Sequence, residues 1–436
     1  MGRRLTLSAM LVVAASSLIS LQLLQPPPVV TSAAHLSPKL SSFVVVARPW
    51  VLRVVTSFLK ALLQQEAYDV IQNKPSGGDG RQLGGAAVTG TAALLVINMS
   101  IGTPTPQNVS GLVHISSQLV WARCSALHTA PAVADAFRPN KSATFSLLPS
   151  ASEMCPSVLR PETCGDGNNT TGAHCDGYVS TYGTVANTSG NLATDTFTFG
   201  STSVPGVVFG CSDATRGDFS GASGVIGLGR GPLSLISQLQ LSRFSYQLWA
   251  IPMTPTPRRS PSRPSTAASS DKASRSTPLL SSTMHPNLYY VNLTGIHVDG
   301  KRLNDIPAGV FDLKTNGSGG VVLSTTIPVT YLEAAAYRVV RKVVASRINL
   351  QPVDGSALGL DLCYSAASMV QVKVPPLKLV FDGAGAEMQL AVANYFLKDD
   401  DTGLECLTML PSMGVSVLGS LLQAGINRST TSPASS

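Results

Sequence analysis

The residues best suited to chemistry lie in a stretch that occurs twice in the chain. The first copy runs from Gly111 to Trp121 (GLVHISSQLVW) and the second from Gly320 to Leu332 (GVVLSTTIPVTYL). Each copy begins with an apolar run short enough for a buried strand, meets small hydroxyl residues, and becomes apolar again. The two junctions read His-Ile-Ser at 114–116 and Ser-Thr-Thr at 324–326, so they offer an imidazole and hydroxyl groups but no carboxylate.

Both copies are followed, further along the chain, by two apolar residues and a glycine. This element is Val225-Ile226-Gly227 for the first copy and Val417-Leu418-Gly419 for the second. Two halves that each contain a strand, a small-residue loop and a later closing strand indicate duplicated β-rich lobes that face one another.

Landmarks spread over residues 94–426 carry a family resemblance. They are Ile101-Gly102-Thr103-Pro104, Leu119-Val120-Trp121, Tyr182-Gly183, Leu192-Ala193-Thr194-Asp195-Thr196, Phe209-Gly210-Cys211, Gly227-Leu228-Gly229-Arg230-Gly231, Tyr289-Tyr290-Val291, Leu293-Thr294-Gly295-Ile296, Asn394-Tyr395-Phe396 and Cys406. In this order they resemble the pepsin-like aspartic endopeptidases (peptidase family A1), in particular the plant nepenthesin-like branch. The resemblance implies an all-β, bilobal, pepsin-like double β-barrel.

The same resemblance exposes a departure at the two loops. The family's loops read Asp-Thr-Gly or Asp-Ser-Gly, and His114 and Ser324 occupy the aspartate positions here. The family's chemistry needs two carboxylates that share one proton, one acting as base on a water and the other donating to the carbonyl. A serine hydroxyl is no carboxylate base, and a histidine is largely cationic at acidic pH. The sequence therefore predicts a protein without intact catalytic residues.

Two further site residues follow from the resemblance. Tyr182 lies where the family's flap tyrosine reaches over the cleft, with an ordinary strand tyrosine as the alternative. Trp121 is either a core and flap-support residue or a ligand contact. His114 and Ser324 could in principle form a nucleophilic Ser–His pair. No third residue to orient the histidine and no oxyanion hole can be identified in the sequence.

The composition indicates a strand-rich protein, and the distribution of charge gives no indication of nucleic-acid binding. Charged residues make up 13% of the chain and hydrophobic residues 44%, with 38 Gly and 29 Pro, a pattern of strands and turns. Much of the net charge of +7 comes from the low-complexity segment containing Arg258, Arg259 and Arg263, so we interpret it as solvated and expect no nucleic-acid partner. The sequence predicts no cofactor and no metal site, because no tight Cys-x-x-Cys pair is present.

The order of segments predicts a secreted protein. Residues 1–34 combine Arg3 and Arg4 with an apolar run and small residues, as in a signal peptide; a membrane anchor is the alternative. No later stretch is apolar enough to span a bilayer. Residues 35–90, with helical spacing of apolar residues over Val51–Gln72, lie where the family carries a prosegment. We assign residues 91–250 to the N-terminal lobe, 251–283 to a Pro/Ser/Arg-rich linker, and 284–436 to the C-terminal lobe.

Sequons and cysteines agree with the secretory route. Nine sequons are present, at Asn98, Asn108, Asn140, Asn168, Asn169, Asn187, Asn292, Asn316 and Asn427. Seven cysteines suit an oxidising compartment, and the odd number leaves at least one thiol. The resemblance implies a disulfide between Cys363 and Cys406. It leaves open how Cys124, Cys155, Cys164, Cys175 and Cys211 pair.

Two regions depart from the family in a way that predicts damage to the fold. The linker shows no strand leading out of the first lobe. The chain also turns polar after Ile426, so the closing strands of the C-terminal lobe are expected to be missing and that lobe incomplete. Lost strands would leave an unpaired sheet edge.

Three functions remain open at this point. The first is an inactive, secreted (or vacuolar), monomeric protein that keeps a cleft for a polypeptide or cell-wall-related ligand, like the inhibitors that this fold is known to yield. The second is an active aspartic endopeptidase with carboxylates outside the expected loops; Asp135, Asp176 and Asp305 are available, but none lies in a suitable local sequence. The third is a decayed gene product without selected activity.

Overall fold

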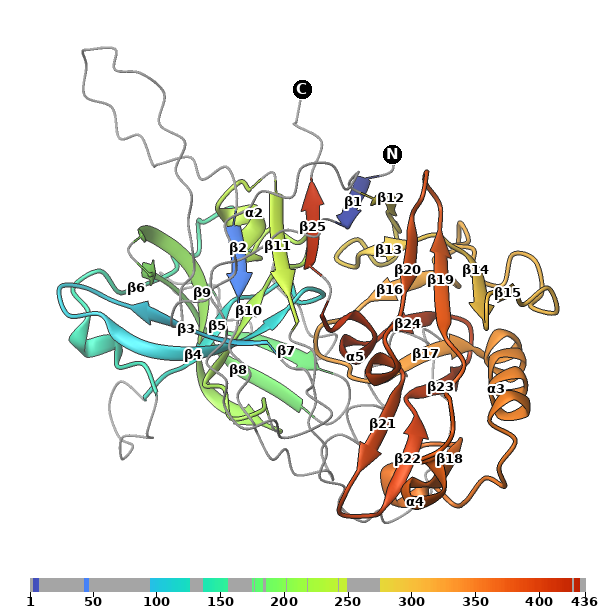
Figure 1. The fold of residues 1–436 in the computed structure, drawn as a ribbon. Helices are drawn as coiled ribbons and strands as arrows, with labels where there is room; N and C mark the ends of the chain where they lie inside the picture. The colour runs from blue at the N-terminus through green and yellow to red at the C-terminus, as the bar shows by residue number, and fades with distance from the viewer. Residues whose placement is uncertain are drawn as a thin grey trace, which may run out of the picture.

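Two β-rich lobes lie side by side in the structure (Figure 1). The structure is a computed structural model. It describes residues 3–7, 43–46, 95–125, 136–155, 175, 177–182, 186–200, 202–217, 219–241, 243–248, 275–425 and 427–431. The predicted helix over 51–72 and the sequons Asn168 and Asn169 lie outside these residues.

The N-terminal lobe is a sheet closed on itself. Its strands follow the order β3-β4-β10-β5-β9-β8, and β3 also pairs with β8, which closes a ring of six strands. The short strands β6 and β7 add to β8. The bounds are β3 Val96–Ile101, β4 Gln107–His114, β5 Trp121–Arg123, β6 Ser146–Leu147, β7 Tyr178–Tyr182, β8 Ala186–Phe199, β9 Thr202–Arg216 and β10 Gly224–Gly227, with the short helices η1 Pro139–Lys141 and α2 Leu235–Gln238.

A ten-stranded sheet crosses from this lobe into the C-terminal one. Its order is β2-β11-β25-β1-β12-β13-β16-β24-β17-β23. Figure 1 places β2, β11, β25 and β1 where the two lobes meet. The bounds are β1 Arg3–Leu7, β2 Phe43–Val46, β11 Arg243–Gln247, β12 Arg275–Leu280, β13 Tyr290–Val291, β16 Val321–Leu323, β17 Thr330–Glu333, β23 Met409–Ser412, β24 Ser416–Leu418 and β25 Asn427–Thr431.

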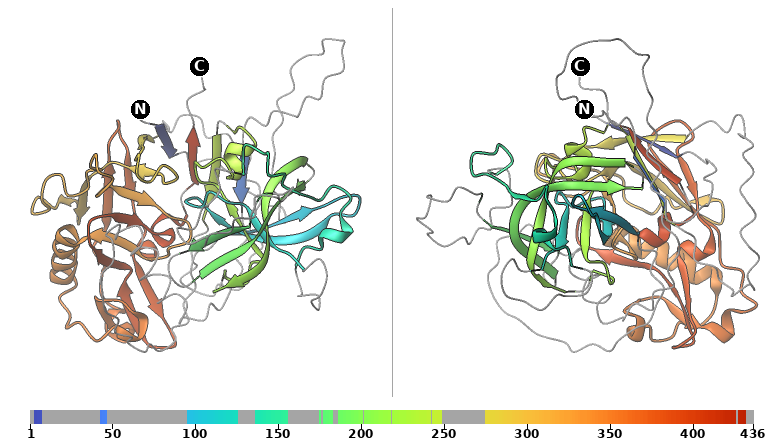
Figure 2. Two further views of the ribbon diagram at one scale, coloured as in Figure 1. Left: turned by 180° about the vertical axis from the view of Figure 1, so that it is seen from behind. Right: turned by 90° about the vertical axis from the view of Figure 1, so that its left-hand side faces the viewer.

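Two smaller sheets and one long helix complete the C-terminal lobe, and the helix, drawn in orange, lies on the side away from the N-terminal lobe (Figure 2, left). The sheets are β15-β14-β19-β20 and β18-β22-β21. The bounds are β14 Leu293–Val298, β15 Lys301–Arg302, β18 Cys363–Ser365, β19 Leu377–Phe381, β20 Glu387–Gln389, β21 Phe396–Asp399, β22 Leu404–Leu407, α3 Ala334–Ile348, α4 Ala366–Met369, α5 Ser420–Gln423, η2 Ser356–Leu358 and η3 Val392–Asn394.

Helix α3 shows how local sequence sets the element bounds. Glu333 caps its start by accepting a 2.7 Å hydrogen bond from the Ala335 amide, and Asn349 ends it in the left-handed conformation that asparagine tolerates. Its buried face carries Tyr337, Val340 and Val344. It is therefore an amphipathic helix that covers the lobe's core.

The predicted internal duplication is confirmed. In the N-terminal lobe β4 pairs parallel with β10, β10 antiparallel with β5, and β5 parallel with β9. In the C-terminal lobe β16, β24, β17 and β23 repeat this arrangement strand for strand. The two apolar-apolar-glycine elements are β10 and β24, each lying beside the strand that leads into a polar loop.

Two inner strands of the ten-stranded sheet, β12 and β25, differ from the sequence-based expectation. The strand thought to be missing from the linker is present as β12, in which Thr277 and Leu279 are buried. The missing closing strand is not confirmed either, because residues 427–431 form β25 between β11 and β1. Both strands pair through their backbones on both edges, and β12 also buries Thr277 and Leu279, whereas the sequence of β25 is polar throughout. β1 lies within the range predicted as signal peptide.

Three disulfides are present among the described residues. Cys363–Cys406 is the bridge that the resemblance implied. Cys124 pairs with Cys211 and Cys155 with Cys175. Cys164, the seventh cysteine, lies outside the described residues.

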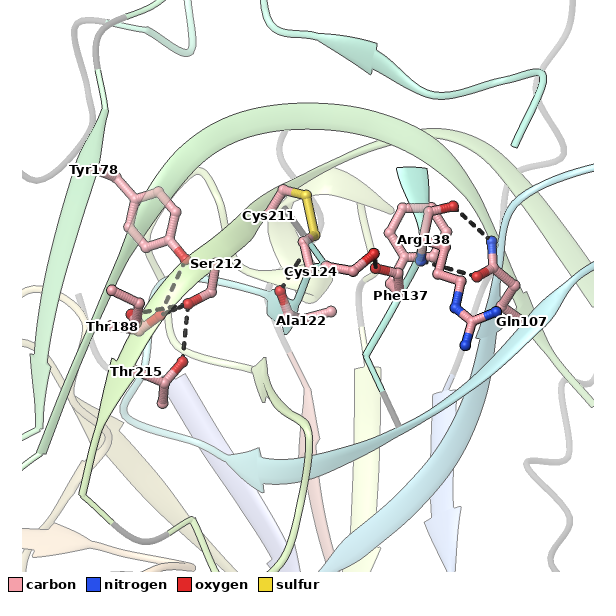
Figure 3. The surroundings of a disulfide bond; sticks show 12 residues. Gln107, Ala122, Cys124, Phe137, Arg138, Tyr178, Thr188, Cys211, Ser212 and Thr215 are labelled. Atoms are coloured by element: carbon pink, nitrogen blue, oxygen red, sulfur yellow. Dashed lines mark hydrogen bonds between the residues drawn. A yellow bond between two sulfur atoms is a disulfide. The ribbon is translucent and has the colours of Figure 1, made fainter. Parts of the chain in front are cut away.

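Buried hydroxyl groups surround the Cys124–Cys211 bridge (Figure 3). The Thr188 hydroxyl donates to Ser212 Oγ at 2.6 Å, and the Tyr178 hydroxyl lies 3.2 Å from Thr188 Oγ1. Burial raises the pKa of Tyr178 far above its ordinary value. These contacts satisfy polar groups that would otherwise be costly inside the sheet.

Candidate functional site

The two polar loops meet between the lobes, each held by a glycine. His114 ends β4 and Ser324 follows β16 directly. A Cβ atom on Gly227 would lie 2.4 Å from the Leu119 carbonyl oxygen, and one on Gly419 would lie 2.3 Å from that of Pro328. Only glycine therefore fits where each closing strand passes under its loop.

Thr325 ties the loops together. Its hydroxyl donates to the Val113 carbonyl at 2.8 Å and accepts from the Ile115 amide at 3.3 Å. Ile115, at the equivalent position of the first loop, has no hydroxyl to return these bonds. The tie between the loops is therefore made by Thr325 alone.

His114 and Ser324 do not form the nucleophilic pair considered from the sequence, because Thr326 stands between them. The Thr326 hydroxyl lies 3.4 Å from His114 Nε2 and 3.4 Å from Ser324 Oγ. His114 Nδ1 accepts from the Ser116 amide at 3.2 Å, which places the proton of a neutral ring on Nε2, facing Thr326. Ser324 Oγ accepts from the amides of Thr326 and Ile327. This hydroxyl caps its own loop.

The residues that replace the family's loop glycines are not strained. Left-handed backbone among the described non-glycine residues occurs at Ser220, Gln240, Asp299 and Asn349. Neither Ser116 nor Thr326 is in this set, so both keep ordinary backbone conformations. The obstacle to chemistry is the side chain: Thr326 fills space between the loops and is 2% exposed.

Tyr182 and Trp121 contact each other beside the first loop. Trp121 Nε1 donates to the Tyr182 hydroxyl at 2.8 Å, and Ser117 Oγ lies 3.3 Å from the same oxygen. The Tyr182 ring lies 5.6 Å from the His114 ring and packs edge-on against Phe219 at 5.3 Å. Tyr182 is buried and Trp121 is fully buried, so both act as packing and positioning residues here.

Gln423 is a site residue that the sequence analysis missed. Its side-chain amide donates to the Ser324 carbonyl at 2.7 Å and to the Leu418 carbonyl at 2.8 Å. Its oxygen accepts from the Tyr246 hydroxyl at 2.7 Å. The available sequence signal was a glutamine in the apolar stretch just after Val417-Leu418-Gly419. It links the second loop to β11 of the other lobe.

Among the described residues, no carboxylate is placed for acid–base chemistry at these loops. Asp195 is buried but accepts from Thr144, Ser142 and its neighbour's amide, within the N-terminal lobe. Asp305 is exposed, and Asp135 and Asp176 lie outside the described residues. Within the same part of the chain, no cluster of three or more His, Cys, Asp or Glu side chains could hold a metal ion.

Most of the described sequons are accessible. The exposed asparagines are Asn98, Asn108, Asn140, Asn187 and Asn316, whereas Asn292 is half-buried. Asn427 lies on β25, and its side chain is outside the description. None of the described helices is long and apolar enough to cross a membrane.

Comparison with known proteins agrees with the two-lobed, duplicated architecture, which is that of the pepsin-like fold. The family model described as "Xylanase inhibitor N-terminal" matches residues 96–263, and "Xylanase inhibitor C-terminal" matches residues 288–427. Aspartic proteinase nepenthesin-1 of Nepenthes gracilis is 36% identical over 335 residues, covering 75% of this chain and 73% of that protein. Nepenthesin-2 of the same plant is 36% identical over 336 residues with the same coverage. The chain therefore belongs to the plant pepsin-like aspartic proteinase family.

Solved structures show the same fold at lower sequence identity. Basic 7S globulin from soybean superposes with a TM-score of 0.54 at 18% identity, covering 79% of this chain and 95% of that one. Conglutin gamma, a basic 7S globulin from lupine seeds, gives a TM-score of 0.53 at 20% identity, covering 78% and 92%. These similarities support the all-β, two-lobed fold and nothing more.

Proposed function

We propose that this protein is a secreted, catalytically inactive member of the aspartic proteinase family that acts as an inhibitor-like binding protein. The observation that carries the proposal is the pair of loops. His114, Thr326 and Ser324 form a buried, mutually hydrogen-bonded set where the family places its two carboxylates. This set lacks the two carboxylates that would share one proton, so it cannot activate a water at acidic pH.

The state of the remaining site supports binding rather than decay. The loop tie through Thr325, the Trp121–Tyr182 hydrogen bond and the two closing glycines are all retained. A chain that had lost all selection would have no reason to keep buried polar groups satisfied across two lobes. The match to the xylanase inhibitor family models supports a polypeptide ligand that is related to the plant cell wall.

The binding proposal is tested by adding the purified, glycosylated protein to secreted plant-cell-wall-degrading endoxylanases and measuring residual xylanase activity. We expect saturable, stoichiometric inhibition by a folded monomer. A matched control is the same protein unfolded and alkylated, which should not inhibit. A folded protein that leaves xylanases unaffected and captures no wall-associated ligand would contradict the binding role.

The secretory route has its own test. Expression in plant cells should give a product in the medium or vacuole, with mass lowered by deglycosylation at the exposed asparagines, among them Asn98, Asn140 and Asn316. An unglycosylated cytosolic product that retains Met1 would contradict this localisation.

A further inference from the structure

The small sheet β15-β14-β19-β20, which Figure 1 places in the C-terminal lobe, has one apolar face and one basic face. The apolar face is buried: Ile296 and Val298 of β14, and Leu377 and Leu379 of β19, are at most 1% exposed. Side chains point alternately to the two faces of a strand, so the residues next to these lie on the opposite, outer face. The side chains of the outer face are half-buried or exposed, so it is the face that meets solvent.

A row of basic side chains crosses this outer face. Arg302 of β15 lies directly opposite His297 of β14, and His297 lies directly opposite Lys378 of β19. The exposed Gln389 of β20, opposite Lys378, completes the row. Neighbouring strands are about 4.8 Å apart, so consecutive members of the row are spaced at that interval. Like charges placed directly opposite one another destabilise a sheet, and an anion bound over the row would offset this cost.

The sheet supplies little negative charge of its own. The basic residues of its four strands are His297, Lys301, Arg302 and Lys378, and their one acidic residue is Glu387. The Glu387 carboxylate accepts from Lys378 Nζ at 3.0 Å, and its backbone carbonyl accepts from Arg275 of β12 at 3.3 Å. The hydrogen bond from Lys378 lowers the pKa of Glu387, and the charges of Arg275 and His297 act in the same direction. A single carboxylate thus lies among several cations.

Arg302 is held against the sheet with its guanidinium exposed. Its Nη2 donates to the Thr294 carbonyl at 2.7 Å, and a Cβ atom on Gly295 would lie 3.3 Å from its guanidinium carbon. The glycine therefore leaves room for the guanidinium to lie on the backbone. Asp299, in the turn between β14 and β15, is paired with Arg347 of α3 at 3.6 Å. An exposed guanidinium fixed in this way can bind a carboxylate through two N–H groups.

We propose that the outer face of this sheet binds an acidic polysaccharide, namely a linear chain of uronic acids. The inference rests on the proposed function in one respect, the secretion of the protein towards a plant cell wall. The spacing favours this partner over an acidic polypeptide. Same-face side chains of an extended peptide lie about 6.7 Å apart, whereas the basic row repeats about every 4.8 Å. A chain of uronic acids carries one carboxylate on every sugar ring, at an interval close to that of the row.

The first arm of the test varies the polymer. The purified, secreted protein is titrated onto immobilised polygalacturonate at low ionic strength. Fully methyl-esterified polygalacturonate is the matched control, because it has the same backbone without the charges, and poly-glutamate represents an acidic polypeptide. We expect saturable binding to polygalacturonate that added salt weakens, and no binding to the methyl ester. Equal binding to the methyl ester, or tighter binding to poly-glutamate, would overturn the proposal.

The second arm varies the protein. Arg302→Gln with Lys378→Gln removes one Arg and one Lys from the row, and Arg338→Gln with Lys342→Gln removes the same charges from the exposed side of α3. Polygalacturonate binding should weaken about tenfold in the first variant and less than about twofold in the second. Glu387→Gln, which removes the one carboxylate, should strengthen binding about threefold.

Equal losses in the two double variants, or weaker binding by Glu387→Gln, would rule out this face as the binding surface. Xylanase inhibition, measured on the same variants, should not change. Failure to bind the polymer is therefore distinguishable from failure of the proposed function.

Discussion

At the scale of single residues, the two loops carry hydrogen-bonded His114 and Ser324 in place of the family's two charged aspartates. His114 Nδ1 accepts a backbone amide, and Ser324 Oγ accepts two. Thr326 lies between the two side chains and is buried. Polar groups that already hydrogen-bond one another leave few donors and acceptors to hold a water. A bound water is the reactant that the family's chemistry activates.

Restoring the two carboxylates should not restore activity. In His114→Asp with Ser324→Asp, Thr326 would still occupy the space between the loops, and Ile115 and Ile327 would offer no hydroxyl to orient the new carboxylates. Misplaced groups can cost about 100-fold in rate, so we expect no detectable acidic endopeptidase activity.

A matched variant that also carries Ser116→Gly, Thr326→Gly, Ile115→Thr and Ile327→Thr is the comparison for this assay. It should be the first to show turnover of unfolded protein at acidic pH. Robust activity from the two carboxylate substitutions alone would mean that the surrounding loop matters less than argued.

The Tyr182 hydroxyl should contribute measurably to stability. Tyr182→Phe leaves the buried Trp121 Nε1–H without the acceptor that it has at 2.8 Å, which should lower the free energy of unfolding by about 1–3 kcal/mol. Tyr290→Phe is the control, because its buried hydroxyl has no hydrogen-bond partner among the described residues. Urea denaturation of both variants should show a clear shift only for Tyr182→Phe; equal shifts would contradict the role given to this hydrogen bond.

At the scale of elements, periodicity predicted what short-range patterns can determine. The repeated strand–loop units and their closing strands β10 and β24 were predicted correctly. Each closing strand is an apolar run that leads to a glycine, and the loop backbone lies too close to that glycine for any side chain. β12 and β25 were not recognised. β25 is polar, β12 combines Arg, Ser, Thr and Pro with two leucines, and distant segments pair with both edges of each strand. The interlobe bonds of Thr325 and Gln423 were missed for the same reason, because their partners lie in other elements.

The tie between the two loops gives a prediction at this scale. Thr325→Val deletes a hydroxyl that both donates and accepts across the lobes, leaving the Val113 carbonyl and the Ile115 amide unpaired. We expect a loss of about 1–3 kcal/mol in the free energy of unfolding, with recovery in Thr325→Ser. Thr277→Val, whose hydroxyl has no partner among the described residues, should change stability by less than about 0.5 kcal/mol. Thermal denaturation of the three variants checks this order.

At the scale of the whole molecule, buried tyrosines should limit stability at high pH. Burial raises the pKa of Tyr290 and Tyr395 to about 12, above their ordinary value of 10.0. The unfolded chain therefore releases these protons at lower pH than the folded protein does. Their contribution is fully present below pH 10 and is lost as pH rises from 10 towards 12.

Alkaline titration measures this directly. Tyrosinate absorbance and tryptophan fluorescence should change together, in one cooperative transition above pH 10, because these tyrosines ionise on unfolding. A gradual tyrosinate signal near pH 10 without any loss of structure would show that the rings are accessible in the folded protein.

The measurement that tests the central claim most directly is a peptidase assay on the purified, folded protein. Unfolded protein is supplied as substrate at acidic pH, with and without a transition-state-analogue inhibitor of aspartic peptidases, and a catalytically competent nepenthesin serves as positive control. We expect no cleavage above background and no binding of the inhibitor. Turnover that the inhibitor abolishes would contradict this expectation.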